Sequence, residues 1–315
     1  MKKIVCLGGG IGTVNLIKGL KEYTKNITVV SSMADDGGST GRLRRLYNIL
    51  PPGDLVSCMA AMSNNQILSD ILTYRFPGKR YTKDEDLAGH KLGNLIMVAM
   101  CDKTDDFNKA ILLFQKTFAI PGRFLPATKA AVTISALTTE GKEVKREEAI
   151  DLGKYRGKKE IERVRLHPAD VKSSRGVVEA MEQADVIIAG PGDLYTTILP
   201  TLIIPDIAAQ LKKTKKRKIF IINITNKPTE TNEYSIQNYI KAVETHLGIF
   251  PFDTILINNN FLYAIPTKWQ KSYKYVSEKN KPYKKVRFIK KDLVDKNFSL
   301  YHSSKKVAKA VLEII

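Results

Sequence analysis

The chain has 315 residues, of which 43% are hydrophobic, and a formal net charge of +19 at pH 7. This length and composition are those of a globular protein with a full core. No unbroken apolar run approaches the ~18 residues of a membrane span, and the opening Met-Lys-Lys precedes a strand-length apolar run rather than a signal-peptide core. We therefore expect a cytoplasmic protein without a membrane span.

The excess positive charge is concentrated late in the chain, in residues 212–218 and 269–285. The second run interleaves aromatic rings with lysines, at Trp269, Tyr273, Tyr275 and Tyr283, as a base-stacking groove does. No helix-turn-helix, zinc-finger or RNP pattern accompanies it. The sequence therefore favours a solvated surface over a nucleic-acid partner.

The first predicted elements lie in IVCLGGGIGTVNLIKGL, residues 4–20, which reads as a strand, a tight glycine turn and a helix. The NAD fingerprint requires Gly-x-Gly-x-x-Gly, but Thr13 or Asn15 stands where the third glycine should be. This mismatch disfavours an NAD-dependent dehydrogenase. The turn still predicts phosphate contacts, for which the candidates are Gly9, Gly10, Gly12 and Thr13.

Short apolar strands and amphipathic helices then alternate along the chain. Strands are predicted at residues 27–31, 186–189, 218–223 and 254–257, and helices at 207–213 and 236–246. This pattern is typical of a Rossmann-like α/β fold with a mostly parallel, doubly wound sheet. We expect the ligand beyond the carboxyl ends of the strands, where the loops meet.

The alternation is interrupted at about residues 129–168. Residues 131–150 have period-two patterning on both sides of Glu140-Gly141, which predicts a β-hairpin, with residues 161–167 as a third strand. We therefore expect a single domain, residues 1–315, with an antiparallel β-hairpin insertion beside the main sheet.

The stretch MADDGGSTGRLRR begins where the second strand should end. Gly37, Gly38 and Ser39 predict a second anion-binding turn at a helix start. Phosphate beside Asp35 and Asp36 requires a bridging cation, and Mg²⁺ is the usual one, so both aspartates are candidate metal ligands. Two other interpretations are a ribose contact by Asp35 and a capped turn with a solvated acidic pair.

Two more loops have a similar composition. GHKLGN places His90 and Asn94 at the start of an apolar helix, and AGPGDLY places Gly190, Gly192 and Asp193 directly after a strand. Each loop alone is a weak signal, and a lone histidine is more often structural. Together with the first turn, however, they indicate one anion-binding cleft.

Several motifs occur in the order found in a known protein family. They are GGGIG, ADDGGSTGRLRR, ILPPGD, GHKLGN, GRFLPAT, GPGDLYTTILP and a late strand ending in NNN. The set covers nearly the whole chain and resembles the CofD/YvcK family, which includes 2-phospho-L-lactate transferases of coenzyme F420 biosynthesis and bacterial gluconeogenesis factors. ADDGGSTGRLRR with ILPPGD looks more like the YvcK branch than the transferase branch.

The resemblance implies a Rossmann-like fold with added elements. In the transferases, the counterparts of the first glycine turn and the acidic pair hold phosphates and a divalent metal, which implies such a site at Gly9, Gly10, Gly12, Asp35 and Asp36. The YvcK-like branch is associated with UDP-sugars such as UDP-N-acetylglucosamine, and with control of carbon flow, cell-wall synthesis and cell shape. Members of the family often form homodimers.

This sequence departs from the family pattern at three places. Ile11 replaces a usual threonine, Asp193 replaces a frequent serine, and residues 301–303 read Tyr-His-Ser where relatives often have Arg-His-Asp. The charge of Asp193 is unfavourable beside a diphosphate unless a metal or lysine offsets it. These differences predict either a changed ligand preference or the loss of the ligand.

Two functional hypotheses follow. The first is a regulatory protein that binds a nucleotide diphosphate sugar across the four loops. The alternative is a transferase that moves a 2-phospho-L-lactate-type group from a nucleotide diphosphate donor to an alcohol with Mg²⁺. Its candidate catalytic residues are Asp35, Asp36 and Arg42.

Overall fold

A computed structural model describes residues 2–78, 87–154, 160–277, 283 and 286–315. Its main sheet contains seven parallel strands in the order β10-β9-β8-β7-β1-β2-β3. The strands are β1 Ile4–Gly8, β2 Ile27–Ser31, β3 Arg123–Pro126, β7 Val186–Ala189, β8 Arg217–Ile221, β9 Thr254–Asn258 and β10 Arg287–Lys291. The predicted Rossmann-like parallel sheet is therefore confirmed.

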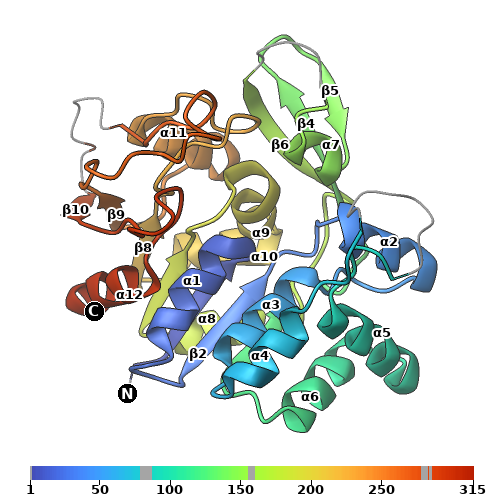
Figure 1. Ribbon diagram of the computed structural model, residues 1–315. Coiled ribbons are helices and arrows are strands. Elements are labelled where there is room, and N and C mark those ends of the chain that lie inside the picture. The colour runs from blue at the N-terminus through green and yellow to red at the C-terminus, as the bar shows by residue number, and fades with distance from the viewer. Residues whose placement is uncertain (1, 79–86, 155–159, 278–282, 284–285) are drawn as a thin grey trace.

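Helices cover both faces of this sheet, which explains why β1 and β7 are apolar and buried along their length. Helix α1 packs against α3 and α12 on one face, and α8 packs against α10 on the other (Figure 1). The helices are α1 Gly10–Leu20, α2 Gly38–Tyr47, α3 Gly53–Met62, α4 Gln66–Thr73, α5 Leu92–Thr104, α6 Phe107–Thr117, α8 Val177–Gln183, α9 Leu199–Leu202, α10 Pro205–Lys213, α11 Ile236–Leu247 and α12 Ser304–Ile314, with a π-helical turn, η1, at Leu194–Ile198.

The strand order reverses between β1 and β7. The chain builds β2 and β3 on one side of β1 and then returns to place β7, β8, β9 and β10 on the other side. A reversal of this kind marks the usual ligand position in such sheets, and the loops after β1 and β7 together line a cavity at the carboxyl edge.

The predicted insertion is a small antiparallel sheet in the order β5-β4-β6, formed by β4 Thr133–Thr138, β5 Glu143–Lys145 and β6 Ile161–His167 (Figure 1). The hairpin prediction is thus confirmed, but its second arm is shorter than expected. Residues 147–151 form helix α7 (Glu147–Asp151), and the backbone N–H of Glu148 donates to Asp36 Oδ1 instead of to a strand partner. Asp36 thereby attaches the insertion to the loop after β2.

Within the described residues, no single helix is long and apolar enough to cross a membrane, although the bent pair Leu194–Leu202 and Pro205–Lys213 reaches the required length and composition together. The lysine- and tyrosine-rich run at 269–285 lies partly outside the described residues. In its described part, the ring of Trp269 packs edge-on against Tyr273.

Candidate functional site

Two adjoining cavities lie at the carboxyl edge of the sheet. The first, of about 230 Å³, opens between the loops after β1, β7 and β8. The second, of about 420 Å³, extends toward the loop after β2 and the insertion. Gly10, Ile11, Asp193 and Thr197 line both cavities, so these residues form the border between them.

The first glycine turn is open to ligand at Gly10 and tightly packed on either side. Gly10 has φ +65°, and a Cβ there would have no heavy atom within 4 Å. A Cβ on Gly12 would lie 2.4 Å from the carbonyl oxygen of Pro191, and one on Gly9 would lie 2.2 Å from Asp54 Oδ2. Glycine at these two positions therefore allows the turn to contact its neighbours closely, while Gly10 faces the cavities.

The loop after β7 is held by an asparagine from the loop after β8. Asn223 Oδ1 accepts from the Gly192 backbone N–H at 2.9 Å, and Asn223 Nδ2 donates to the Gly192 carbonyl at 3.0 Å. Gly190 has φ +77°, and a Cβ there would lie 2.6 Å from the carbonyl of Ile221. Thr13 is fully buried, and its hydroxyl donates to the Pro191 carbonyl at 3.4 Å, so it supports this loop instead of lining a cavity.

Tyr273, Tyr301 and His302 complete the wall of the first cavity. Burial lowers the pKa of the His302 imidazole to about 3, so this ring is neutral. The departures from the family pattern at Ile11, Asp193 and Tyr301 therefore line the cavities, whereas Ser303 lies outside their lining, at the N-cap of α12.

The second glycine turn is enclosed, in contrast to the first. Ser39 and His90 are buried, and Ser39 Oγ pairs with His90 Nδ1 at 2.8 Å. Burial, with Arg42 and Arg75 nearby, lowers the pKa of His90 to about 4. Arg42 donates to the carbonyl of Ala88.

Of the other residues in this region, Gly38 and Asn94 are also buried, and of residues 37–39 only Gly37 lines the second cavity. The second turn therefore lies close to the cavities, but most of its residues that were predicted to contact a ligand are buried away from them.

The two adjacent aspartates face different surroundings. Asp36 is buried, its Oδ2 accepts from Arg146 Nε at 3.1 Å, and its Oδ1 accepts from the Glu148 backbone. Asp35 lines the second cavity, and its Oδ1 accepts from the Gly37 backbone N–H at 3.0 Å. Asp35 is therefore the member of the pair that a ligand or cation in the cavity can meet.

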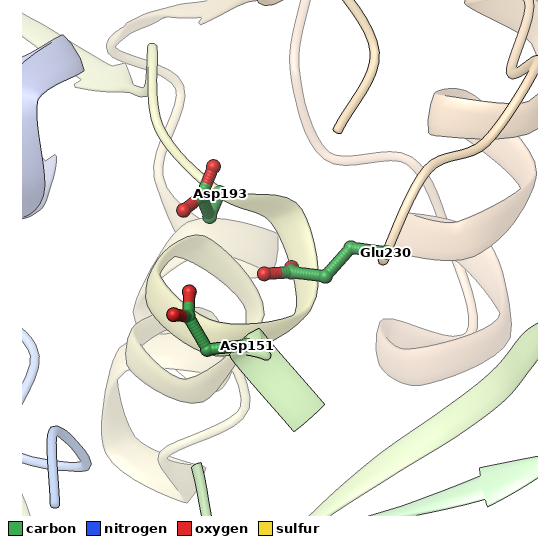
Figure 2. A group of neighbouring side chains, drawn as sticks. All are labelled: Asp151, Asp193 and Glu230. Atoms are coloured by element: carbon green, nitrogen blue, oxygen red, sulfur yellow. The ribbon is translucent and has the colours of Figure 1, made fainter. Parts of the chain in front are cut away.

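Behind this border, a lysine whose side chain is 16% exposed lies among three carboxylates and offsets part of their charge. Lys227 Nζ donates to Asp193 Oδ2 at 2.8 Å, to Glu230 Oε1 at 2.9 Å and to Asp151. Figure 2 shows that the three carboxyl groups converge from three segments, and their oxygens lie within 4.8 Å of one another. Although burial lowers the pKa of Lys227, these carboxylates raise it well above its ordinary value overall. The ammonium group therefore occupies the place that a metal ion would take in this cluster.

The second cavity has an acidic lining. Asp35, Asp54, Glu147, Glu148 and Asp151 face it, beside two cations, Lys91 and Arg75. Glu147 is only 9% exposed, and burial, together with Asp35 and Asp151, raises the pKa of its carboxyl to about 10. The cavity therefore favours ligand groups that donate hydrogen bonds or carry a divalent cation.

Sequence reasoning did not single out Lys227, Asn223 or Glu147. Lys227 and Asn223 follow β8, so the rule that ligand loops follow the carboxyl ends of parallel strands could have found them. Glu147 gives no such signal, because it lies in the predicted hairpin arm.

The reversed strand order and the crevice beside its glycine turns define a Rossmann-like α/β protein. Residues 4–296 match the family described as 2-phospho-L-lactate transferase CofD. The chain is 35% identical to the gluconeogenesis factor of Bacillus subtilis, over 99% of this chain and 98% of that protein, and 33% identical to the gluconeogenesis factor of Halalkalibacterium halodurans, over 99% and 96%. A crystal structure of a UPF0052 family member from Bacillus halodurans superposes with a TM-score of 0.89 at 33% identity, covering 99% of this chain and all of that one. The chain therefore belongs to the CofD family and is similar to its gluconeogenesis factors.

Proposed function

We propose that this chain is a cytoplasmic regulatory protein that binds a nucleotide diphosphate sugar, such as UDP-N-acetylglucosamine, across the two cavities. Gluconeogenesis factor is the name of its relatives, and the proposed role is control of carbon metabolism, cell-wall synthesis and cell shape. The observation that carries the proposal is the open backbone at Gly10, on the border between two cavities at the switch point of a parallel sheet.

Local charge supports placing the diphosphate at the Gly10 turn. The glycine turn ends at the N-terminus of α1, where backbone N–H groups and the helix dipole favour an anion. Lys227 pairs with Asp193 as well as with Asp151 and Glu230, so it reduces the negative charge of the aspartate that departs from the family pattern. A Mg²⁺ ion at Asp35 would neutralise further phosphate charge, whereas both oxygens of Asp36 already accept hydrogen bonds.

Thermal unfolding with and without UDP-N-acetylglucosamine tests the proposal. A ligand at 100 times its dissociation constant stabilises the native state by about 2.7 kcal/mol. We expect UDP-N-acetylglucosamine to raise the melting temperature, and glucosamine alone to leave it unchanged. The absence of a shift with every nucleotide diphosphate would contradict the proposal.

We also propose that the chain forms a homodimer. Light scattering in the same buffers, which measures the molar mass in solution, tests it.

A transferase is the second candidate, favoured by the lining of the second cavity. Carboxylates of Asp35 and Asp54 face the cations of Lys91 and Arg75 there, the combination that phosphoryl-group chemistry with Mg²⁺ uses. In this reaction an alcohol displaces the nucleotide, and a phospho-lactate-type group moves to the alcohol oxygen. Release of nucleotide from such a donor with Mg²⁺ and an alcohol, abolished by Asp35→Asn, would favour the enzyme.

A further inference from the structure

Glu147 has an unusual environment for a carboxyl group. The residue is only 9% exposed, its carboxyl group has no hydrogen bond to another described residue, and this group lines the second cavity. A buried polar group normally has a partner, since leaving it without one costs free energy. The position of Glu147 therefore points to a group that enters the cavity from outside.

The charges around Glu147 indicate the sign of that group. The charged groups that act on it most strongly are Asp35, Asp151, Lys227 and Asp36. Three of these are carboxylates, and Lys227 already pairs with Asp151, Asp193 and Glu230. An anion would be repelled at this point, whereas a cation would offset the local charge.

The attachment of the insertion determines which way Glu147 faces. Asp36 holds the residues on both sides of Glu147, through Arg146 Nε and the Glu148 backbone N–H. Asp35 precedes Asp36 in the chain, and Glu147 lies between the two residues that Asp36 binds. Both Asp35 and Glu147 line the second cavity. The loop after β2 also passes closely over Glu147, because a Cβ on Gly37 would lie 3.2 Å from Glu147 Oε2.

We propose that Glu147 is a second protein ligand, contributed by the insertion, of the divalent cation that Asp35 binds. This inference rests on the cation in the proposed function and adds a residue that no motif indicates. Mg²⁺ is commonly held by one or two carboxylates, with phosphate oxygens and water in the remaining positions. Asp35 and Glu147 supply such a pair, and the diphosphate at the Gly10 turn supplies the remaining charge.

Mn²⁺ binding to the full chain, followed by electron paramagnetic resonance, tests the proposal with a paramagnetic substitute for Mg²⁺. We expect Glu147→Gln to weaken Mn²⁺ binding in the presence of UDP at least tenfold, and Asp35→Asn to weaken it similarly. The matched control is Glu143→Gln, which makes the same change at a half-exposed position on β5 of the same insertion and should leave Mn²⁺ binding unchanged. Thermal unfolding of each variant shows that it is folded.

The outcomes separate this inference from the proposed function. Unchanged Mn²⁺ affinity in folded Glu147→Gln would overturn the role of Glu147, even if UDP-N-acetylglucosamine still binds the wild type. If no nucleotide diphosphate binds the wild type, but Mn²⁺ alone binds and Glu147→Gln weakens it, the cation site stands and the proposed ligand falls. Equal weakening by Glu143→Gln would also overturn the inference, because the effect would then reflect the net charge of the insertion.

Discussion

The two glycine-rich turns of this protein have similar sequences and very different surroundings. In the turn after β1, Gly10 faces two cavities and open space. In the turn after β2, Ser39 is buried against His90, and Asp36 is bonded to the insertion. A glycine-rich turn at a strand end thus becomes a ligand surface only if no other segment covers it. The insertion and the segment just before α5, which contains Ala88 and His90, cover the second turn.

Lys227 holds together the three carboxylates behind the first turn. Removing this lysine should cause the largest loss of unfolding free energy. Lys227→Met leaves three converging carboxylates without their shared cation, and because Glu230 is fully buried we expect this to cost about 3 kcal/mol of unfolding free energy. Urea denaturation measures the loss. The double variant Lys227→Met/Asp193→Ser should recover part of it, as should millimolar Ca²⁺, because the oxygens of Asp151, Asp193 and Glu230 are close enough to bind an ion. A loss below ~1 kcal/mol would contradict a structural role for this lysine.

The enclosure of the second turn should make it sensitive to acid through His90. Its folded-state pKa is lowered from 6.5 to about 4, so below pH ~6.5 the unfolded state binds a proton that the folded state does not. The stability is fully present above the unfolded pKa and falls as the pH drops through the folded pKa, by about 3 kcal/mol in total. Unfolding free energies of wild type and His90→Gln across this range test it: the wild type should show a steeper loss, and parallel curves would exclude His90 as the cause.

The attachment of the insertion to the second turn should depend on Asp36. Asp36→Asn weakens two hydrogen bonds that involve a buried charge, and we expect a loss of about 2 kcal/mol. Asp35→Asn is the matched control beside it and should cost less than ~1 kcal/mol, since Asn keeps the acceptor for the Gly37 N–H. If both variants lose equal stability, the division of roles between the two aspartates is wrong.

Adding a single methyl group to each turn compares their ability to bind a ligand most directly. Gly10 and Gly38 both have positive φ, +65° and +47°, so alanine at either position should cost about 1 kcal/mol of stability. Only Gly10→Ala places a methyl group in the cavities, and we expect it to weaken UDP-N-acetylglucosamine binding by about tenfold, or ~1.4 kcal/mol. Calorimetric titration of both variants checks this, and equal affinities would show that Gly10 does not contact the ligand.

The sequence predicted local structure better than side-chain direction. Period-two patterning located β6 at residues 161–167, and a continuous apolar run located β7 at residues 186–189, because these patterns follow directly from burial. The same reasoning treated Asp35 and Asp36 alike, but a side chain's direction depends on what packs against it. Asp36 meets Arg146, which is 110 positions away, and no local pattern encodes that contact.

The attachment of α7 at both ends has a consequence for how the cleft opens. Its start is bonded to Asp36 on the β2 side of the sheet, and Asp151 at its end is bonded to Lys227 on the β8 side. This short helix therefore cross-links the two halves of the fold above the crevice. The residues around the crevice are therefore preorganised, so ligand binding costs little conformational entropy of the protein. Amide hydrogen exchange at residues 148–151 should accordingly be slow even without ligand.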